Sequence, residues 1–355
     1  MRFEQMSEDI RYSLAPFLDL FDLRRLRIVS RSEHKVGGNI QIWRRLASLV
    51  WPEWVSVFDC PNAAINAYVA IVSGQMLHTS LCRQYGQVAS SSAQLATINS
   101  YGHVTTGDNM NYSFWHHIHP FDARCMIVLG STDIVSTDGR IMHVCQEGNI
   151  AYMWLPGQIR YLAPHGHNSW CCVTADGSTW LCRCHYAGTA DERTHVSMVS
   201  SPAQLALQGY AGIATCAACV KNTVEFWIGC TTGVYRTNDG QVSWVWQTCR
   251  ILDVCSLDNM VAAASAHDEI RVWNTLGTVL YTCQAITLSH YRLSAVHGTN
   301  AFTYGPLTID AAQRRTYRVA NNESMITERR YTADGRHGVF KYNCPRLVRF
   351  VHIAT

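Results

Sequence analysis

The sequence predicts a protein that is α+β by segments, with a short three-helix unit at the N-terminus followed by an all-β propeller of about six or seven blades. Two observations support this fold class. Helical apolar spacing is confined to residues 8–50, whereas short strand-like runs divided by glycine-containing turns begin near residue 55. The composition agrees, because charged residues make up only 15% of the 355 positions and hydrophobic ones 48%, which is typical of short buried strands.

The N-terminal segment carries two apolar stripes at helical spacing. The first is formed by Ile10, Leu14, Phe17 and Leu18, and the second by Leu23, Leu26 and Val29. Asp22 is placed to cap the second helix, "VGGN" at 36–39 interrupts the pattern, and a third helix or turn follows in "IWRRLASLV". Helices this short bury little surface among themselves, so we expect them to dock on another surface.

The strand-like sequence pattern is clearest in four stretches, at residues 133–145, 169–184, 225–247 and 260–283. Each of them reads as a hairpin, because β-branched and aromatic runs flank turns such as Asp-Gly. Hairpins of this kind recur over roughly 300 residues, and a propeller blade takes about 40–45 residues. A β-sandwich would be complete within a much shorter chain, so the recurrence favours a propeller.

One turn, "GVYRTNDGQVSW" at 233–244, resembles the Asp-box of sialidase-type propellers. The matching positions are Thr237, Asp239, Ser243 and Trp244. The resemblance implies a structural turn in which Asp239 accepts hydrogen bonds from backbone amides and Trp244 packs between strands. A shorter relative of the same turn is "TADGSTW" at 174–180.

A second short stretch, "SAHDEIRVWN" at 265–274, is similar to the end of a WD repeat. Asn274 stands where an aspartate normally follows the tryptophan, which is Trp273 here. The Asp-box and WD-like stretches both favour a propeller, and they leave open which kind of propeller it is.

The segment from Met6 to Leu46 resembles an F-box in the order and spacing of its residues. The matching features are the first apolar stripe, the Asp22-Leu23 step, the "LRIVSR" core at 26–31 and the closing "IWRRL" at 42–46. F-box helices interlock with a Skp-type adaptor of cullin-RING ubiquitin ligases. The resemblance therefore implies a chain that binds such an adaptor and, through it, a cullin.

The resemblance also implies which side chains would meet the adaptor. The expected apolar anchors are Ile10, Leu14, Phe17, Leu18, Leu23, Leu26, Val29, Trp43 and Leu46. Arginines at Arg24, Arg25, Arg27, Arg44 and Arg45 would form a rim that steers association with an acidic adaptor. The alternative is that the same helices form a cap packed on the side of the propeller.

These interpretations predict two domains. The F-box-like module covers residues 6–50 and the propeller covers 51–355, with "ASLVWPEW" at 47–54 as the joint between them. We expect Trp51 and Trp54 to pack against the propeller edge.

Groups with catalytic or metal-binding chemistry are present, but their spacing favours ordinary roles. "WHHIHP" at 115–120 and the His- and Cys-containing strands between 165 and 185 lack the paired CxxC spacing of a zinc ribbon. "CAAC" at 216–219 lies in a strand-like run, which favours a core role over a redox role. Sialidase chemistry would need arginines and tyrosines such as Arg160, Tyr161, Arg193, Arg236 and Arg271 to converge. We predict no enzyme, cofactor or metal.

The N-terminal sequence and the cysteine content indicate where in the cell the chain is expected. The N-terminus lacks the features of a secretory signal or a mitochondrial presequence, and no apolar run is long enough to span a membrane. Fifteen scattered cysteines read as small buried hydrophobic residues in a reducing compartment. We expect the chain in the cytoplasm or nucleus, without membrane association.

Together these features predict a non-catalytic substrate receptor of a ubiquitin ligase whose propeller binds an unidentified protein target on its face or central opening. The alternative is a structural or RNA-associated regulatory subunit that uses the same helices for assembly without ubiquitination. A formal charge of +3 does not favour RNA, and the basic stretch 329–350 is the place to look for phosphate contacts, although its alternation is more typical of strands that close a ring.

Overall fold

The computed structural model describes strands between residues 78 and 200 with gaps between them, residues 214–319 with short gaps, and the strands of residues 326–352. Residues 1–77 lie outside the described part of the chain. The predictions for the module at 6–50, for its apolar anchors and rim arginines, and for the joint at 47–54 therefore remain predictions.

The described residues form seven four-stranded antiparallel sheets, which we call blades 1 to 7 in chain order. Blade 1 comprises β2 (Val88–Ser90), β3 (Leu95–Ile98), β4 (Val104–Gly107) and β5 (Ser113–Trp115). Blade 2 comprises β6 (Cys125–Leu129), β7 (Asp133–Thr137), β8 (Ile141–Gln146) and β9 (Asn149–Trp154). Blade 3 comprises β10 (Ile159–Gly166), β11 (Ser169–Thr174), β12 (Thr179–Arg183) and β13 (His195–Ser200).

The remaining blades have the same plan. Blade 4 comprises β14 (Ala214–Cys219), β15 (Phe226–Cys230), β16 (Gly233–Asn238) and β17 (Gln241–Gln247). Blade 5 comprises β18 (Ile251–Leu257), β19 (Met260–Ser265), β20 (Glu269–Asn274) and β21 (Val279–Gln284). Blade 6 comprises β22 (Leu293–Val296), β23 (Ala301–Tyr304), β24 (Leu307–Asp310) and β25 (Arg315–Arg318). Blade 7 comprises β26 (Ile326–Tyr331), β27 (His337–Tyr342), β28 (Val348–His352) and β1 (His78–Cys82).

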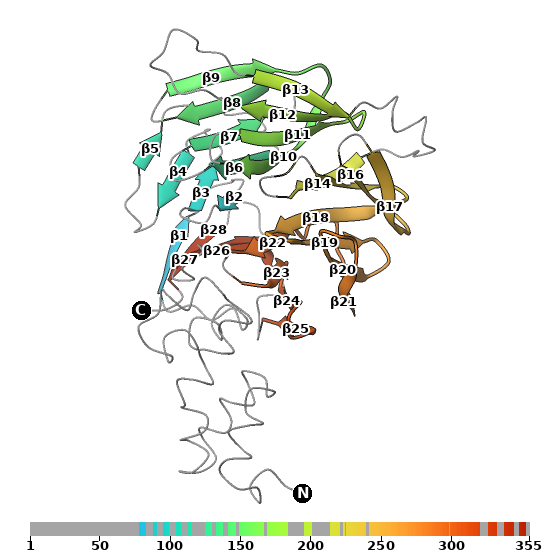
Figure 1. The fold of residues 1–355 in the computed structure, drawn as a ribbon. Coiled ribbons are helices and arrows are strands. Elements are labelled where there is room, and N and C mark those ends of the chain that lie inside the picture. The colour runs from blue at the N-terminus through green and yellow to red at the C-terminus, as the bar shows by residue number, and fades with distance from the viewer. Residues whose placement is uncertain are drawn as a thin grey trace, which may run out of the picture.

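The first strand of each blade lies at the centre of a closed ring. Each of these inner strands, β2, β6, β10, β14, β18, β22 and β26, contacts the next, and β26 contacts β2. Figure 1 shows the seven blades arranged around this centre. This arrangement is that of a β-propeller, as the recurring strand pattern predicted, and the blade number is the upper of the two values expected.

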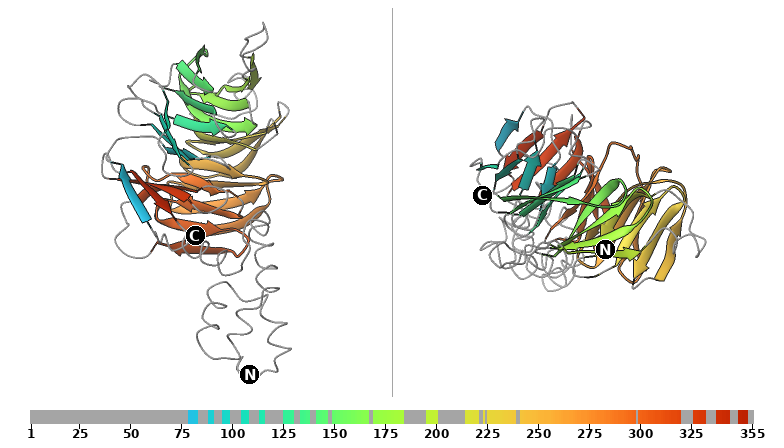
Figure 2. Two further views of the ribbon diagram at one scale, coloured as in Figure 1. Left: turned by 90° about the vertical axis from the view of Figure 1, so that its left-hand side faces the viewer. Right: turned by 90° about the horizontal axis from the view of Figure 1, so that it is seen from above.

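The ring is closed by a strand from near the start of the described chain. β1 pairs antiparallel with β28, with His78 opposite His352 and Cys82 opposite Val348. Figure 2 shows blue β1 beside the red C-terminal strands in both views. Because this pairing joins segments more than 250 residues apart, it prevents the ring from opening at its ends.

Burial falls from the inner to the outer strands of the later blades. Every residue of β19 is buried, including a run of alanines at 262–264 with no exposed surface. Small side chains in a strand that is covered on both faces let neighbouring sheets approach closely. In contrast, the outer strands β17, β21 and β25 alternate between exposed and partly buried residues, as expected at the rim.

Blades 4 and 5 are joined by a tryptophan cluster. Trp273 lies 5.7 Å from Trp227 and 5.6 Å from Trp246 between ring centroids. Trp227 donates its indole N–H to Glu225 at 2.6 Å, which satisfies a buried donor. Trp273, the tryptophan of the WD-like stretch, is only 1% exposed and therefore belongs to the core.

Two of the four predicted hairpins are longer units than expected. Residues 133–145 and 169–184 contain the hairpins β7–β8 and β11–β12 as predicted. Residues 225–247 and 260–283 instead form three-stranded meanders, β15–β16–β17 and β19–β20–β21. In both stretches a third strand follows the first hairpin, which strand spacing alone could not reveal. Within its described residues the chain is all-β.

Candidate site at the propeller axis

Four inner strands share one irregularity near their starts. The register shifts after the first residue of β10, β14, β18 and β26, so that the second residue forms a bulge. The third residues therefore occupy equivalent places around the axis, and they are Tyr161, Cys216, Asp253 and Glu328. We call the end of the propeller at which the inner strands begin the proximal face.

Asp253 is a buried carboxylate that connects blades 5 and 6. Its side chain is 8% exposed and accepts hydrogen bonds from the backbone N–H of Leu293 at 2.8 Å and of Val254 at 3.0 Å. Burial raises the pKa of Asp253 to about 6, against the opposing effect of Arg292 and of these two N–H donors. Asp253 therefore fixes the start of β22, the strand that follows Arg292.

Glu328 contacts or lies opposite two cations of its own blade, Arg330 and Lys341. Glu328 is 3% exposed and accepts a hydrogen bond from Nε of Arg330 at 2.6 Å. Lys341 is the cross-strand partner of Glu328. Burial lowers the pKa of Lys341, Glu328 raises it, and the arginines at 292 and 330 lower it further. These groups form a compact set in which opposite charges compensate each other.

Arg292 is the exposed member of this set. Its backbone N–H donates to the carbonyl of Thr327 at 2.9 Å, which joins blade 6 to blade 7. Burial lowers the pKa of Arg292, but Asp253, Glu328, Tyr161 and Cys216 raise it, in that order, so that the result is an increase. The guanidinium donates to the carbonyls of Ser289 at 3.2 Å and Tyr291 at 3.3 Å in its own connection, and groups from blades 3, 4, 5 and 7 act on its pKa.

We call Asp253, Arg292, Glu328, Arg330 and Lys341 the axial charge cluster. With all members ionised it holds three positive and two negative charges, so it has an excess of one positive charge. A cluster of this kind can bind an anionic group through the solvent-exposed Arg292, because charge-assisted hydrogen bonds to a guanidinium are strong and directional.

The loops that surround the cluster on the proximal face are held by hydrogen bonds. The connections that lead into β10, β18 and β22 bond to the turns between the second and third strands of their own blade or the preceding one. The backbone pairs are Ala175 to Gln158 at 2.7 Å, Ala266 to Arg250 at 2.8 Å and Ala285 to Asp268 at 2.8 Å. The side chain of Asp268 also accepts from the N–H of Thr287 at 2.7 Å. These bonds give the face a fixed shape.

The proximal face also exposes apolar and cationic side chains. Trp154, at the end of β9, and Ile286, in the connection between β21 and β22, are each 67% exposed. Arg160 is exposed at the bulge of β10. Large exposed apolar residues beside cations are typical of surfaces that bind other proteins.

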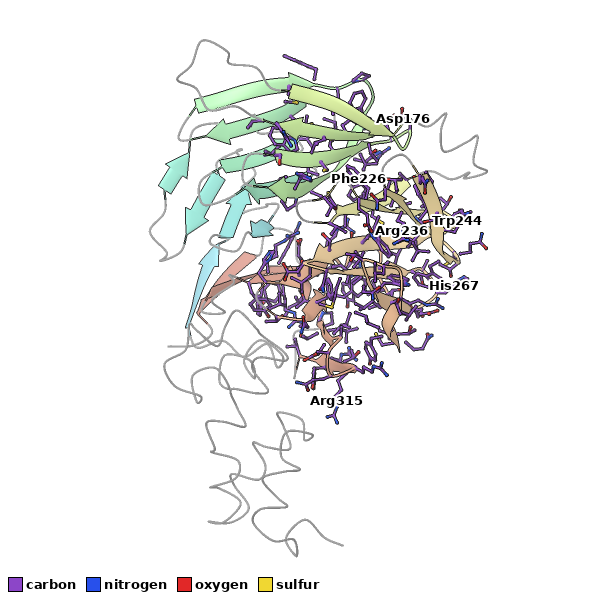
Figure 3. The ribbon with its side chains drawn as sticks, viewed as in Figure 1. Asp176, Phe226, Arg236, Trp244, His267 and Arg315 are labelled. Atoms are coloured by element: carbon purple, nitrogen blue, oxygen red, sulfur yellow. The ribbon has the colours of Figure 1, made fainter. Side chains whose placement is uncertain are left out.

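The turns singled out in the sequence have structural roles. Asp176 of the "TADGSTW" turn accepts from the backbone N–H of Ser178 at 3.1 Å and from its hydroxyl at 3.0 Å. In the longer Asp-box-like stretch, Trp244 packs edge-on against Tyr235 at 6.1 Å, and Asp239 lies outside the described residues. Asn274 of the WD-like stretch accepts from the N–H of Thr278 at 2.8 Å. Figure 3 shows Asp176 and Trp244 on separate blades.

Two of the arginines considered for sialidase chemistry, Arg236 and Arg271, have separate structural contacts. Arg236 donates to Ser243 at 3.2 Å and to the carbonyl of Thr275 at 2.7 Å, whereas Arg271 pairs with Glu269 and lies 4.5 Å above the ring of Trp246. Arg193 lies outside the described residues. Arg236 and Arg271 therefore stabilise the outer part of blades 4 and 5.

Most of the cysteines that the structure describes lie in the core. Cys171 of β11 and Cys219 of β14 bring their sulfur atoms to 3.4 Å, and Cys172 and Cys182 bring theirs to 3.9 Å. "CAAC" forms part of β14 and its two thiols are buried, which agrees with the predicted core role. Within the part of the chain that the structure describes, no three metal-ligating side chains gather at one point.

The comparisons with known proteins give the fold. No protein-family model matches the chain, and no curated protein matches it. Among solved structures, it is similar to the β-propeller domain of Cps50 (Swd1) from Myceliophteria thermophila, with a TM-score of 0.58 and 8% identity over 78% of this chain and all of that domain. The structural similarity shows a shared propeller architecture, and at identity this low it shows the fold alone. The described residues also contain no helix that is long and apolar enough for a membrane span.

Proposed function

We propose that the chain is a non-catalytic receptor subunit that binds a protein target on the proximal face of its propeller. The observation that carries this proposal is the solvent-exposed Arg292 in a fixed axial cluster, with Trp154 and Ile286 exposed on the same face. Exposed tryptophan and arginine supply much of the binding energy at protein interfaces. The target would present an acidic group to Arg292 and apolar side chains to the surrounding loops.

We further propose that the module at residues 6–50 joins the propeller to a Skp-type adaptor and a cullin, so that the bound target is ubiquitinated. The support is the F-box-like order of residues between Met6 and Leu46. This role needs no enzymatic group on the propeller itself, because the ligase partners supply the chemistry. We expect the complex in the cytoplasm or nucleus.

The adaptor step is tested by direct binding of the full-length chain to a purified Skp-type adaptor. Leu23→Asp with Trp43→Ala places a charge in the expected apolar contact and removes its largest anchor. We expect this double variant to lose at least about 100-fold in affinity, because each change typically costs a few kcal/mol at an interface. Arg183 is exposed at the end of β12, opposite the proximal face. Arg183→Gln is therefore the matched control, and we expect it to retain wild-type affinity. Equal affinity of the double variant would exclude the F-box assignment.

An RNA-associated regulatory subunit is the second candidate, and one observation favours it. Arg314, Arg315 and Arg318 are exposed on or beside the outer strand β25, and Figure 3 shows Arg315 projecting from the rim. The basic stretch 329–350 gives it less support than expected, since Arg329 is fully buried and Arg330 pairs with Glu328. Salt-dependent binding of single-stranded RNA that is lost in Arg315→Glu with Arg318→Glu would favour this candidate.

A further inference from the structure

One exposed cation of the axial charge cluster is shared by two carboxylates. Arg292 immediately precedes Leu293, whose N–H donates to Asp253 at 2.8 Å, so the backbone bond keeps this carboxylate close to the start of the Arg292 side chain. On the other side the N–H of Arg292 is bonded to Thr327, which adjoins Glu328. Asp253 and Glu328, both buried, thus lie beside the backbone around Arg292 in neighbouring blades, and their charges act on any anion that binds the exposed guanidinium.

The two carboxylates differ in how their charge is balanced. Glu328 has a direct ion pair with Arg330 and lies opposite Lys341. The hydrogen bonds that Asp253 accepts come from backbone N–H groups, and Arg292 is the cation that most strongly favours its ionised form. Asp253 is therefore the carboxylate whose protonation would leave the Glu328–Arg330 pair unchanged.

The titratable groups of the described residues that interact with Asp253 come from several elements. They are Arg292 before β22, Glu328 on β26, Cys216 on β14, Cys255 on β18 and Tyr304 on β23. Burial raises the pKa of Cys216, Cys255 and Tyr304, and Asp253 raises each further, so these three groups stay neutral near neutral pH. Burial raises the pKa of Asp253 to about 6, which makes it the member that changes charge in mildly acidic solution.

We propose that Asp253 is a pH-sensitive counterion of Arg292, which opposes the binding of an acidic target group while it is ionised and ceases to oppose it once it is protonated. The proton comes from solvent, and no other bond is made or broken. The inference rests on the proposed target-binding role of the proximal face. By linkage, an anion bound at Arg292 must in turn favour the protonated form of Asp253.

The test uses the full-length chain and pyrene tetrasulfonate, a fluorescent polyanion whose charge is constant over the range studied. Its affinity is measured by fluorescence anisotropy at about pH 7.5 and about pH 5.5 in the wild type, Asp253→Asn, Arg292→Gln and the control Arg183→Gln. Histidines elsewhere also gain charge at the lower pH, so the decisive quantity is the difference between wild type and Asp253→Asn.

We expect the wild type to gain roughly fivefold more affinity on acidification than Asp253→Asn, because only the wild type loses a negative charge beside the site when the pH falls. Asp253→Asn should bind at about pH 7.5 as tightly as the wild type binds at about pH 5.5, apart from the histidine contribution. Equal pH ratios in the two proteins would overturn the inference. Unchanged affinity of Arg292→Gln at both pH values would instead overturn the proposed axial site itself.

A second measurement keeps the inference testable should Asp253→Asn fail to fold. The carboxyl carbon shift of Asp253 is followed by NMR in the wild type with and without the sulfonate. Binding must raise the pKa of Asp253, and the increase must disappear in Arg292→Gln. A pKa of Asp253 that is the same with and without bound sulfonate contradicts the proposal.

Discussion

The guanidinium of Arg329 donates to the backbone carbonyl of Leu307 at 2.6 Å, across the junction between blades 6 and 7. It also donates to the carbonyl of Gly305 at 2.9 Å and to the hydroxyl of Thr308 at 2.9 Å. The side chain has no exposed surface. A buried arginine of blade 7 thus satisfies the polar groups of a turn in blade 6 and holds these two blades together.

Replacing Arg329 should therefore weaken the closed ring. We expect Arg329→Gln to lower the free energy of unfolding by about 3 kcal/mol, because the shorter side chain leaves several buried carbonyl and hydroxyl groups unpaired. Arg318→Gln on the exposed outer strand β25 removes no buried contact and should cost at most about 0.5 kcal/mol. Urea unfolding of both variants at neutral pH measures the difference, and equal losses would contradict the assigned role of Arg329.

A glycine on β15 is required by the close approach of blades 4 and 5. A β-carbon at Gly229 would lie 2.6 Å from Cγ2 of Ile251 and would also overlap the sulfur of Cys216. We expect Gly229→Ala to destabilise the fold by about 1–3 kcal/mol through overpacking. A β-carbon at Gly277 would make only ordinary contacts with the Arg236 guanidinium, at 3.8 Å or more, but φ is +88°, so Gly277→Ala tests backbone strain and should cost about 1 kcal/mol. Thermal unfolding that ranks Gly277→Ala as the more damaging change would argue against the tight junction.

The stability of the fold should respond to pH through Asp253. Because burial raises its pKa to about 6, above the unfolded value of 3.8, its contribution is fully present below pH 3.8 and is lost as pH rises through 6. The loss amounts to about 3 kcal/mol at 1.36 kcal/mol for each pKa unit. We expect urea unfolding of Asp253→Asn to lack this slope between about pH 4 and 6.

Asp176 provides a control of opposite sign. Burial acts to raise the pKa of Asp176, but hydrogen bonds from Thr174 and Ser178 prevail and lower it. Its contribution is therefore present above the unfolded pKa and is lost as pH falls through the folded value. Asp176→Asn should reduce stability at neutral pH and leave the slope assigned to Asp253 intact. A variant of Asp176 that removed that slope would show that the assignment to Asp253 is wrong.

Features of the fold that depend on local sequence were predictable. The Asp-Gly turn at Asp176 and the strand that carries Trp273 are set by neighbouring residues, and both have the structure that their sequences indicate. The ring closure by β1 was not predictable. It pairs residues near 80 with residues near 350, and no local signal marks such a partner.

The candidate site was largely invisible in the sequence because its members come from separate blades. Asp253, Arg292 and Glu328 are almost 40 residues apart along the chain and meet only when the ring forms. A signal did exist for two of them: Asp253 interrupts the apolar run "ILDVCSL", and Glu328 lies in "ITERRY", where a charge in an inner strand requires a partner. Arg292 lies in a connection and carried no such signal.

The central claim, that the proximal face binds the target, is tested most directly by quantitative affinity purification of the full-length Arg292→Glu variant beside the wild type and Arg183→Glu. We expect Arg292→Glu to keep the adaptor and cullin at wild-type levels while it loses the proteins that bind the propeller, and Arg183→Glu to keep both groups. Retention of every partner by Arg292→Glu would contradict the account.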